Sequence, residues 1–201
     1  MSDAKKLGAK FREVAKGFNI KVKPIYTNGR QPIGNGLGPV LEMVDILKVL
    51  KNESNLPMDL KEKSLMLSSE LMKLAGIRNS RKKAEEILSS GKAYEKFREI
   101  VNAQNGKDDF DKRIKKLKTG KFNKIIRAKR TGKISKISNK KINSLCRILG
   151  TPETIGAGVY LYKHLGKVSK GEIMMTLYSE SKSKIKDGLK FIKKSRPIEI
   201  K

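Results

Sequence analysis

The sequence predicts an α/β protein, in which a larger mixed α/β segment is followed by a small α+β module. Three observations predict this fold. The order helix, strand, glycine-rich loop, helix between residues 4 and 51 is typical of α/β sheets. A strongly polar stretch over residues 102–123 favours a boundary or linker. Beyond it, short strand-like pieces alternate with glycine turns. We therefore expect two domains, residues 1–115 and 116–201.

The chain opens with a predicted helix and a predicted strand. Residues 4–18 place apolar side chains at three- and four-residue steps, at Leu7, Phe11, Val14 and Phe18. This spacing predicts one apolar helix face. Residues 20–26 alternate apolar and polar residues, which predicts a strand. Pro24 places this strand at a sheet edge or a strand end, because proline has no N–H to donate.

A loop dense in glycine, asparagine and proline covers residues 27–39, and helices follow it. Pro39 suits the first turn of a helix that extends to about residue 51. Further helices are predicted over residues 59–76, 81–89 and 93–103, with Gly76 ending the first of these. The expected inward side chains of these helices are Leu41, Val44, Ile46, Leu47, Leu50, Leu65, Leu67, Leu71, Met72, Leu74, Tyr94, Phe97, Ile100 and Val101.

The second module is predicted from shorter patterns. Strands are expected within residues 123–138 and in the two glycine-bounded runs 156–166 and 171–181. Helices are expected over residues 139–150 and 181–195, and residues 196–200 favour a last strand. Cys146 lies among apolar neighbours on the first of these helices, which indicates a core position.

The chain is very basic, with a formal net charge of +27 from 47 lysine and arginine residues against 20 acidic ones. A polyanion such as RNA is one interpretation. An A/T-rich genome is the other, since lysine, isoleucine and asparagine dominate while tryptophan is absent. Arginine forks and stacking aromatics, typical of nucleic-acid readers, are few. The basic residues that would contact RNA are Lys140, Lys141, Lys190, Lys193 and Lys194.

Bulk features also bear on location. No run of about 18 apolar residues predicts a membrane-spanning helix. The first residues lack the apolar core of a secretory signal. One cysteine excludes an intrachain disulfide and fits a reducing cytoplasm.

The glycine loop at residues 31–42 matches neither of the two common nucleotide-binding patterns. No Gly-Lys-Ser/Thr follows it, and the spacing of Gly34, Gly36 and Gly38 differs from Gly-x-Gly-x-x-Gly. Glu42 and Asp45 lie in the first turns of the next helix, where carboxylates stabilise the helix N-terminus and repel phosphate. A tight structural turn, a partner-domain contact and a cation site of carbonyl and carboxylate oxygens all remain open.

Residues 26–45 carry a resemblance to a known family. They read YTNGRQPIGNGLGPVLEMVD and closely resemble the Thr-Asp-Gly-x-Gln-Pro-hydrophobic-Gly-x-x-hydrophobic-Gly-Pro/Asn-Ala-Leu-Glu segment of thymidine and AMP phosphorylases, most of all the archaeal-type branch. Three later stretches agree in order, at residues 91–106, 149–159 and 168–181. Asn28, Arg30 and Asn105 depart from the family pattern.

The resemblance implies the C-terminal part of a nucleoside or nucleotide phosphorylase, an enzyme in which inorganic phosphate displaces the base from the anomeric carbon. In that family the phosphate loop and the residues that handle the base lie upstream of the segment matched by residues 5–18. We therefore assign no catalytic residue to this chain and expect an N-terminal phosphorylase half as its partner. The base, the 5′-phosphate requirement and any homo-oligomer remain open.

The resemblance also implies one metal site. In similar bacterial pyrimidine nucleoside phosphorylases a monovalent cation lies between the phosphate loop and the glycine-rich segment. The matching donors here are the carbonyl oxygens of Ile33 and Gly36 and the carboxylate of Asp45, oxygen ligands that suit a hard cation. His164, the single histidine, has no assignable orienting partner and is interpreted as a surface or turn residue. A non-enzymatic RNA-binding module is the competing functional hypothesis.

Overall fold

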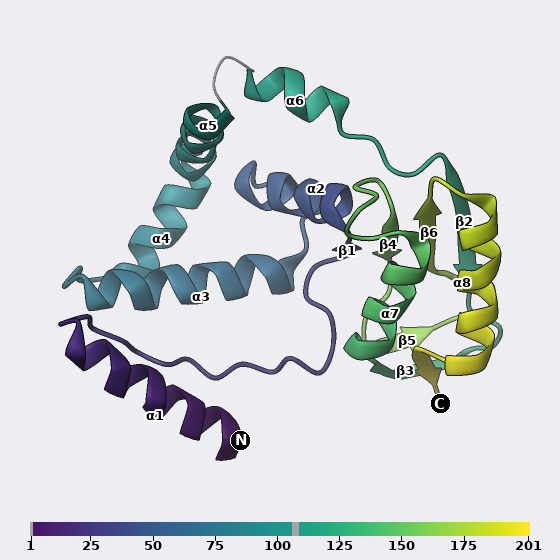
Figure 1. Ribbon diagram of the computed structural model, residues 1–201, viewed down its shortest axis with the longest axis horizontal. Helices are drawn as coiled ribbons and strands as arrows, with labels where there is room; N and C mark the ends of the chain where they lie inside the picture. Colours follow the sequence, from purple (N-terminus) through teal and green to yellow (C-terminus); the bar gives the residue numbers. More distant parts are fainter. Residues whose placement is uncertain (1, 106–108) are drawn as a thin grey trace.

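The computed structural model describes residues 2–105 and 109–201, which form eight helices and seven strands (Figure 1). Gly106, which belongs to one of the family-like stretches, lies outside the described residues. The α/β class predicted from the sequence is confirmed. None of the described helices is long and apolar enough to cross a bilayer.

In the first part of the chain, the described residues form six helices and one very short strand. Its elements are α1 (Ser2–Gly17), β1 (Gly36–Leu37), α2 (Pro39–Leu50), α3 (Met58–Leu74), α4 (Ser80–Ser89), α5 (Lys92–Asn105) and α6 (Phe110–Lys116). Helices α2 to α5 share a small core around Val49, Leu65, Ala84 and Leu88. The predicted helices are confirmed, and Pro39 and Gly76 occupy the predicted start of α2 and the turn after α3.

The predicted inward faces were partly wrong. Leu41, Leu47 and Leu65 are buried, whereas Leu67 and Leu71 of α3 and Ile46 and Ile100 are exposed. Helix α3 carries apolar side chains on more than one face, so the spacing of these residues alone does not indicate which face is buried.

The predicted strand at residues 20–26 was also wrong. Residues 20–29 form no regular secondary structure and run as an extended segment between α1 and the glycine loop (Figure 1). A strand exists only when a neighbouring backbone accepts and donates its hydrogen bonds, and no described strand lies against this segment. Lys23 forms an ion pair with Glu70 of α3, and this contact holds the segment beside that helix.

The polar stretch at residues 102–123 contains a helix that the sequence interpretation missed. Asp109 caps α6, since its side chain accepts a hydrogen bond from the Asp111 N–H. Phe110 is only 1% exposed and packs edge-on against the rings of Tyr94 and Phe97 of α5. Phe110 and the ion pair between Arg98 and Asp111 therefore attach this largely polar stretch to α5.

The second part holds two antiparallel sheets and two helices. Its elements are β2 (Phe122–Arg127), β3 (Gly132–Ile137), α7 (Asn139–Leu149), β4 (Gly158–Leu161), β5 (Gly166–Val168), β6 (Ile173–Ser179), α8 (Lys182–Ser195) and β7 (Ile198–Ile200). The strand orders are β1-β4-β6-β2 and β5-β3-β7. These elements match the predicted strands and helices of the second module, except that β5 was not predicted.

The main core lies between these sheets and the two helices. Leu145, Leu149, Val159 and Leu177 are fully buried in it. Strand β1 joins the larger sheet, pairing Leu37 with Val159, so the glycine loop is attached directly to the second part of the chain. The division at residues 115 and 116 stays a prediction.

Candidate functional site

The glycine loop wraps around the carboxylate of Asp45. The backbone N–H groups of Asn35 and Gly36 donate to Asp45 Oδ2, with N–O distances of 2.6 and 2.7 Å. Asp45 is only 1% exposed. Two hydrogen bonds to a buried charged acceptor are stronger than neutral ones, so this carboxylate fixes the path of the loop.

Two glycines are required by close backbone approaches. Gly38 has a φ of +128°, a conformation that side chains disfavour, and an added Cβ would overlap the carbonyl oxygen of Ala157. A Cβ on Gly36 would overlap the carbonyl oxygen of Leu41. The glycines therefore allow β1 to lie between α2 and β4.

The second oxygen of Asp45 has no hydrogen-bond partner. Asp45 Oδ1 is buried, and no described residue donates to it. A buried carboxylate oxygen without a donor carries a large desolvation cost unless a cation or another donor compensates it. The predicted cation ligands Gly36 and Asp45 lie together, joined through the Gly36 N–H, and Ile33 lies three residues earlier on the same loop. Within residues 2–105 and 109–201, no group of three or more His, Cys, Asp or Glu side chains could hold a metal ion. The three-residue cation assignment stays a prediction.

A polar network adjoins this loop, and the sequence interpretation missed it. His164 Nε2 lies 2.9 Å from Asn35 Oδ1, and Asn35 Nδ2 donates to the Tyr160 hydroxyl at 3.4 Å. Lys48 Nζ donates to the same hydroxyl at 3.1 Å. His164 is half-buried in the loop between β4 and β5, in keeping with its interpretation as a surface or turn residue, and it has a hydrogen-bond partner that the sequence did not indicate. The network ties the tip of the loop to β4 and α2.

Cys146 is buried beneath the same loop, which confirms its predicted core position. Its side chain is 5% exposed, and Sγ donates to the Leu37 carbonyl oxygen at 3.7 Å. Burial, followed by the negative charge of Glu42, raises the pKa of the thiol to about 12. The thiol therefore remains protonated at neutral pH and is a poor nucleophile.

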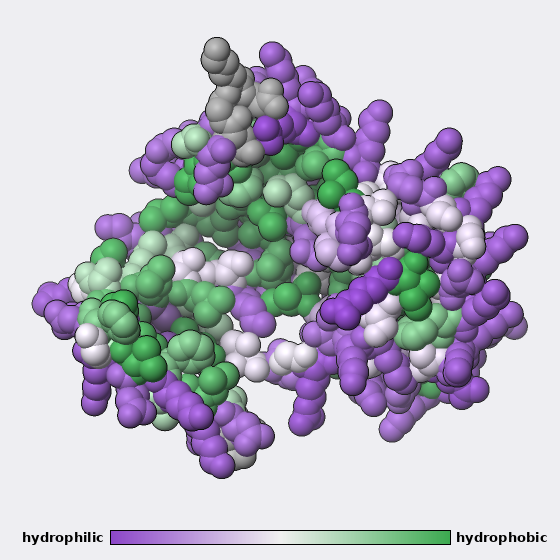
Figure 2. Space-filling model, in the orientation of Figure 1, coloured by the Kyte–Doolittle hydropathy of each residue, from purple (hydrophilic) through white to green (hydrophobic). Residues whose placement is uncertain are grey.

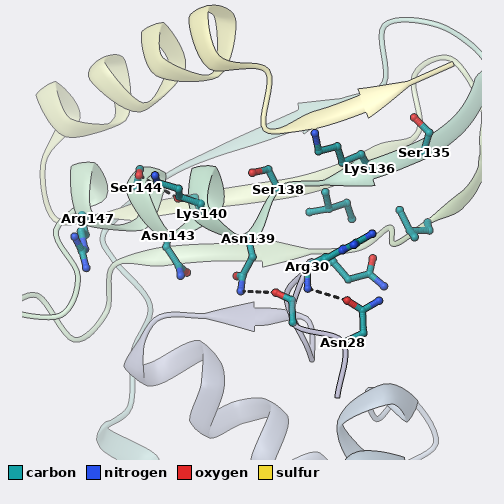
Figure 3. A pocket seen from close by; sticks show the side chains of 14 residues that line it. Asn28, Arg30, Ser135, Lys136, Ser138, Asn139, Lys140, Asn143, Ser144 and Arg147 are labelled. Atoms are coloured by element: carbon teal, nitrogen blue, oxygen red, sulfur yellow. Dashed lines mark hydrogen bonds between the residues drawn. The ribbon is translucent and has the colours of Figure 1, made fainter. Parts of the chain in front are cut away.

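A basic cavity of about 990 Å³ lies beside the segment that leads into the glycine loop (Figure 3). Residues 28–31 form one wall, and β3 and α7 form the others. The Asn139 N–H and side chain donate to the carbonyl oxygens of Arg30 and Gly29, each at 3.4 Å. The segment that precedes the glycine loop is thus fastened to the start of α7.

The lysines predicted to contact RNA are distributed over two helices. Lys140 lies on α7 and borders the basic cavity, whereas Lys190, Lys193 and Lys194 lie on α8. Lys141 donates to the Ser195 carbonyl oxygen at 2.6 Å and joins the two helices. RNA binding by these residues stays a prediction.

Comparison with characterised sequences shows what the chain is similar to. It is 33% identical to the AMP phosphorylase of Methanocaldococcus jannaschii over 100% of this chain, and 36% identical to that of Methanococcus aeolicus over 98%. The AMP phosphorylase of Thermofilum pendens is 32% identical over 98% of this chain. This chain spans about 40% of the length of these relatives. No protein-family model matches the sequence. The chain is therefore homologous over its whole length to the AMP phosphorylases and corresponds to their C-terminal part.

Proposed function

We propose that this chain is the C-terminal part of a phosphorylase that cleaves a nucleoside 5′-monophosphate, with inorganic phosphate as co-substrate. The part of these phosphorylases that this chain does not match completes the enzyme, and we call it the partner. The observation that carries the proposal is the end-to-end match to AMP phosphorylases, which covers only about 40% of their length. The family-like glycine loop, closed on Asp45, supports it.

The reaction divides between this chain and the partner. A phosphate oxygen attacks C1′ of the nucleotide, the N-glycosidic bond breaks, and the base leaves with the electron pair and takes up a proton. Catalysis of this displacement depends on holding both anions in line and on stabilising the departing negative charge. The partner supplies the phosphate- and base-binding groups, and this chain supplies the glycine loop, the two sheets and the surface that receives the partner.

The apolar face of α1 is the first element of that surface. Leu7, Phe11 and Val14 lie along one side of α1, and Phe18 follows its last residue; the four side chains are 56%, 61%, 63% and 73% exposed. Figure 2 shows hydrophobic side chains gathered over the helical part of the molecule, while the surface over the sheets is largely hydrophilic. Contiguous exposed apolar side chains of this size mark protein-binding surfaces.

The extended segment at residues 20–26 is the second element. Ile20 and Val22 are 59% and 37% exposed, and within the described ranges this segment pairs with no strand. An unpaired extended backbone accepts a strand from another chain, with main-chain hydrogen bonds supplying affinity. We call α1 and residues 20–26 together the docking face, and its occupant is a strand-bearing segment of the partner.

A monovalent cation at the glycine loop is a further part of the proposal. Its ligands would be the carbonyl oxygens of Ile33 and Gly36 and the carboxylate of Asp45. The buried and unpartnered Asp45 Oδ1 suits such a cation, because a hard cation binds oxygen donors and would compensate the buried charge. The domain division at residues 115 and 116 and a cytoplasmic location complete the proposal.

Co-expression tests the central claim. The chain is produced with the first ~60% of the Methanocaldococcus jannaschii AMP phosphorylase, the share that it does not match. Co-purification and phosphate-dependent release of adenine from AMP are expected, with neither polypeptide active alone. Uridine and thymidine serve as parallel substrates to test nucleoside specificity.

A matched pair of variants then tests the docking face. Phe11→Asp should abolish co-purification, whereas Arg12→Asp on the adjacent position of α1 should retain it. A stable complex that releases no base from AMP, uridine or thymidine would contradict the proposed reaction. Full activity of the chain alone would contradict the proposed division of labour.

A further inference from the structure

We propose that a strip of lysines along α8 and the edge strand β2 binds the phosphate backbone of a nucleic acid without reading its sequence. We call these residues the basic strip; its members are Lys121, Lys124, Lys182, Lys186, Lys190 and Lys193. Lys190 and Lys193 are also among the lysines that the sequence predicts for RNA contact. The proposal does not depend on phosphorolysis or on the docking face.

Four lysines of the basic strip form a stripe along α8, at steps of three or four residues: Lys182, Lys186, Lys190 and Lys193. This spacing places them on one flank of the helix, and all four are exposed. From its first to its last lysine the stripe extends over about 16 Å of helix. Ile185 and Gly188 are buried on a different side of α8, so the stripe is held at the surface.

The stripe lies on the flank of α8 that faces β2 (Figure 1). Lys182 Nζ lies 5.3 Å from the centre of the Phe122 ring in β2, and Lys121 Nζ lies 5.9 Å from the same centre. Strand β2 is an edge of the larger sheet. Lys124 is exposed on it and, by the alternation of a strand, shares the face of Phe122. The lysines of the helix and of the strand therefore form one surface.

The cationic surface continues beyond the end of the stripe. A cavity of about 1040 Å³ lies between β2, α8 and β7, and Lys193 lines it together with four other exposed cations, Lys129, Arg130, Arg196 and Lys201. Arg130 donates to the Ile200 carbonyl oxygen and keeps its positive charge. Glu199 also lines the cavity and is paired with Lys136 at 3.5 Å. A nucleic acid that extends past α8 therefore meets further cations here.

Few carboxylates compete for the basic strip. Asp187 pairs with Lys190 at 3.3 Å, and both side chains are exposed, so this ion pair contributes little to stability. Glu180 accepts a hydrogen bond from the Lys121 backbone N–H at 3.3 Å. Within the described ranges, the other lysines of the basic strip form no ion pair. Cations along one surface repel each other, and a polyanion would relieve that repulsion.

The distribution of charge along the chain separates this surface from a general bias in composition. Residues 116–201 contain 23 basic and only 5 acidic residues, whereas residues 1–115 contain 24 basic and 15 acidic ones. An A/T-rich genome would enrich lysine in both parts, but it would not remove aspartate and glutamate from one of them. A basic stripe along a helix, in a part of the chain poor in acid, is typical of nucleic-acid binding.

The residue types favour a nucleic-acid backbone over a membrane. A helix that lies in a membrane surface inserts exposed apolar side chains, whereas Ile185, Leu189 and Ile192 of α8 are buried or half-buried against the core. The basic strip has no arginine, the residue that most often reads bases through paired hydrogen bonds. Lysine binds phosphate as a point charge, so contacts to the backbone position the ligand without specifying its sequence.

The test is a fluorescence anisotropy titration of labelled oligouridylate with the full chain over a range of KCl concentrations. We expect saturable binding with a Kd below about 100 µM at 150 mM KCl. The logarithm of the association constant should fall with the logarithm of KCl concentration with a slope of about −4, since each of the six lysine contacts contributes about 0.7 on a single strand. A mixed-sequence oligonucleotide of the same length should bind within about threefold of oligouridylate.

Charge-matched variants separate the basic strip from general basicity. Replacing the four α8 lysines of the stripe by glutamine should weaken binding at least about tenfold and reduce the slope by about 3. The control replaces four exposed lysines of α1 by glutamine and should bind within about threefold of the wild type; its changes are Lys5→Gln, Lys6→Gln, Lys10→Gln and Lys16→Gln. Lys186→Gln with Lys190→Gln should produce about half the change in slope and guards against misfolding of the fourfold variant.

Four results would overturn the assignment. The first is an equal loss of affinity in the two fourfold variants, and the second is an unchanged salt dependence in the stripe variant. The third is the absence of saturable oligonucleotide binding at 150 mM KCl. The last is binding to phosphatidylserine vesicles without binding to either oligonucleotide, which would identify a membrane-binding surface.

Discussion

Among the groups that hold the glycine loop in place, the carboxylate of Asp45 is the one whose removal should lower the free energy of unfolding most. In Asp45→Ala, the part-buried N–H of Asn35 and the buried N–H of Gly36 lose their shared acceptor. Each unsatisfied buried donor costs about 1–3 kcal/mol. The expected loss in the free energy of unfolding is therefore about 4 kcal/mol, a large share of the ~5–15 kcal/mol that stabilises a typical domain.

Asp45→Asn separates the charge from the hydrogen bonds. The amide oxygen can still accept from both N–H groups, but the bonds lose their charge assistance, worth about 1 kcal/mol each. We expect a loss of about 2 kcal/mol. Glu42→Ala is the matched control, because Glu42 lies on the same helix and accepts one hydrogen bond from the Gly38 N–H at 3.0 Å, but is exposed. Its expected cost is about 1 kcal/mol or less.

Urea unfolding followed by circular dichroism at 222 nm measures all three variants. Equal m-values would show that the comparison concerns stability and not a change in the unfolded ensemble. If Asp45→Ala unfolded at the same urea concentration as Glu42→Ala, the carboxylate would not hold the loop. The structural argument for the loop would then fail.

Three further predictions follow from the same region. Gly38→Ala should destabilise the chain by about 3 kcal/mol or more in urea unfolding, because Gly38 has a positive φ and an added Cβ would overlap the Ala157 carbonyl. Gly29→Ala is the control: a Cβ at Gly29 meets no neighbouring atom, so stability should change by less than about 1 kcal/mol. Cys146 should resist iodoacetamide at pH 8 until urea unfolds the chain. Because its folded pKa of about 12 exceeds the unfolded value of 9.0, its contribution to stability should be complete below pH 9 and decline between pH 9 and 12; rapid native-state labelling would contradict this. Replacing N-methylglucamine chloride with potassium chloride at equal ionic strength should raise the melting temperature of the wild-type chain with its partner bound, but not that of Asp45→Asn. An equal rise in both proteins would exclude a cation at this carboxylate.

Local patterns explain why the helices could be predicted from the sequence. The start of α2 at Pro39 and the turn at Gly76 depend on the intrinsic backbone preferences of those two residues. The buried side of α7 follows from a narrow stripe with one clear direction. Helix α3 has apolar residues on several sides, and its packing against α2 and α4 decides that Leu65 is buried and Leu71 is not.

The polar network at the loop could not be predicted in the same way. Asn35 and His164 are 129 residues apart in sequence, and their contact exists because β1 pairs with β4. Asn35 lies between two glycines, which suggested a turn and gave no indication of its side-chain partners. Phe110 illustrates a different limit, because Phe110, Ile114 and Leu117 follow helical spacing within a run so rich in charge that the run was interpreted as a linker.

The two most instructive differences between sequence and structure have one physical cause. Residues 20–26 alternate like a strand but have no partner, and α1 has a helical apolar stripe that stays exposed. These patterns have different periods, 2 and about 3.6 residues, so they arise independently. Each predicts burial against another element, and in the described part of the chain neither is satisfied. Burying one large apolar side chain contributes about 1.5–3 kcal/mol, so the four exposed residues of the α1 stripe could contribute several kcal/mol to association. Both unsatisfied patterns lie next to each other before the glycine loop, which is why a single partner that adds a strand and covers α1 explains them together.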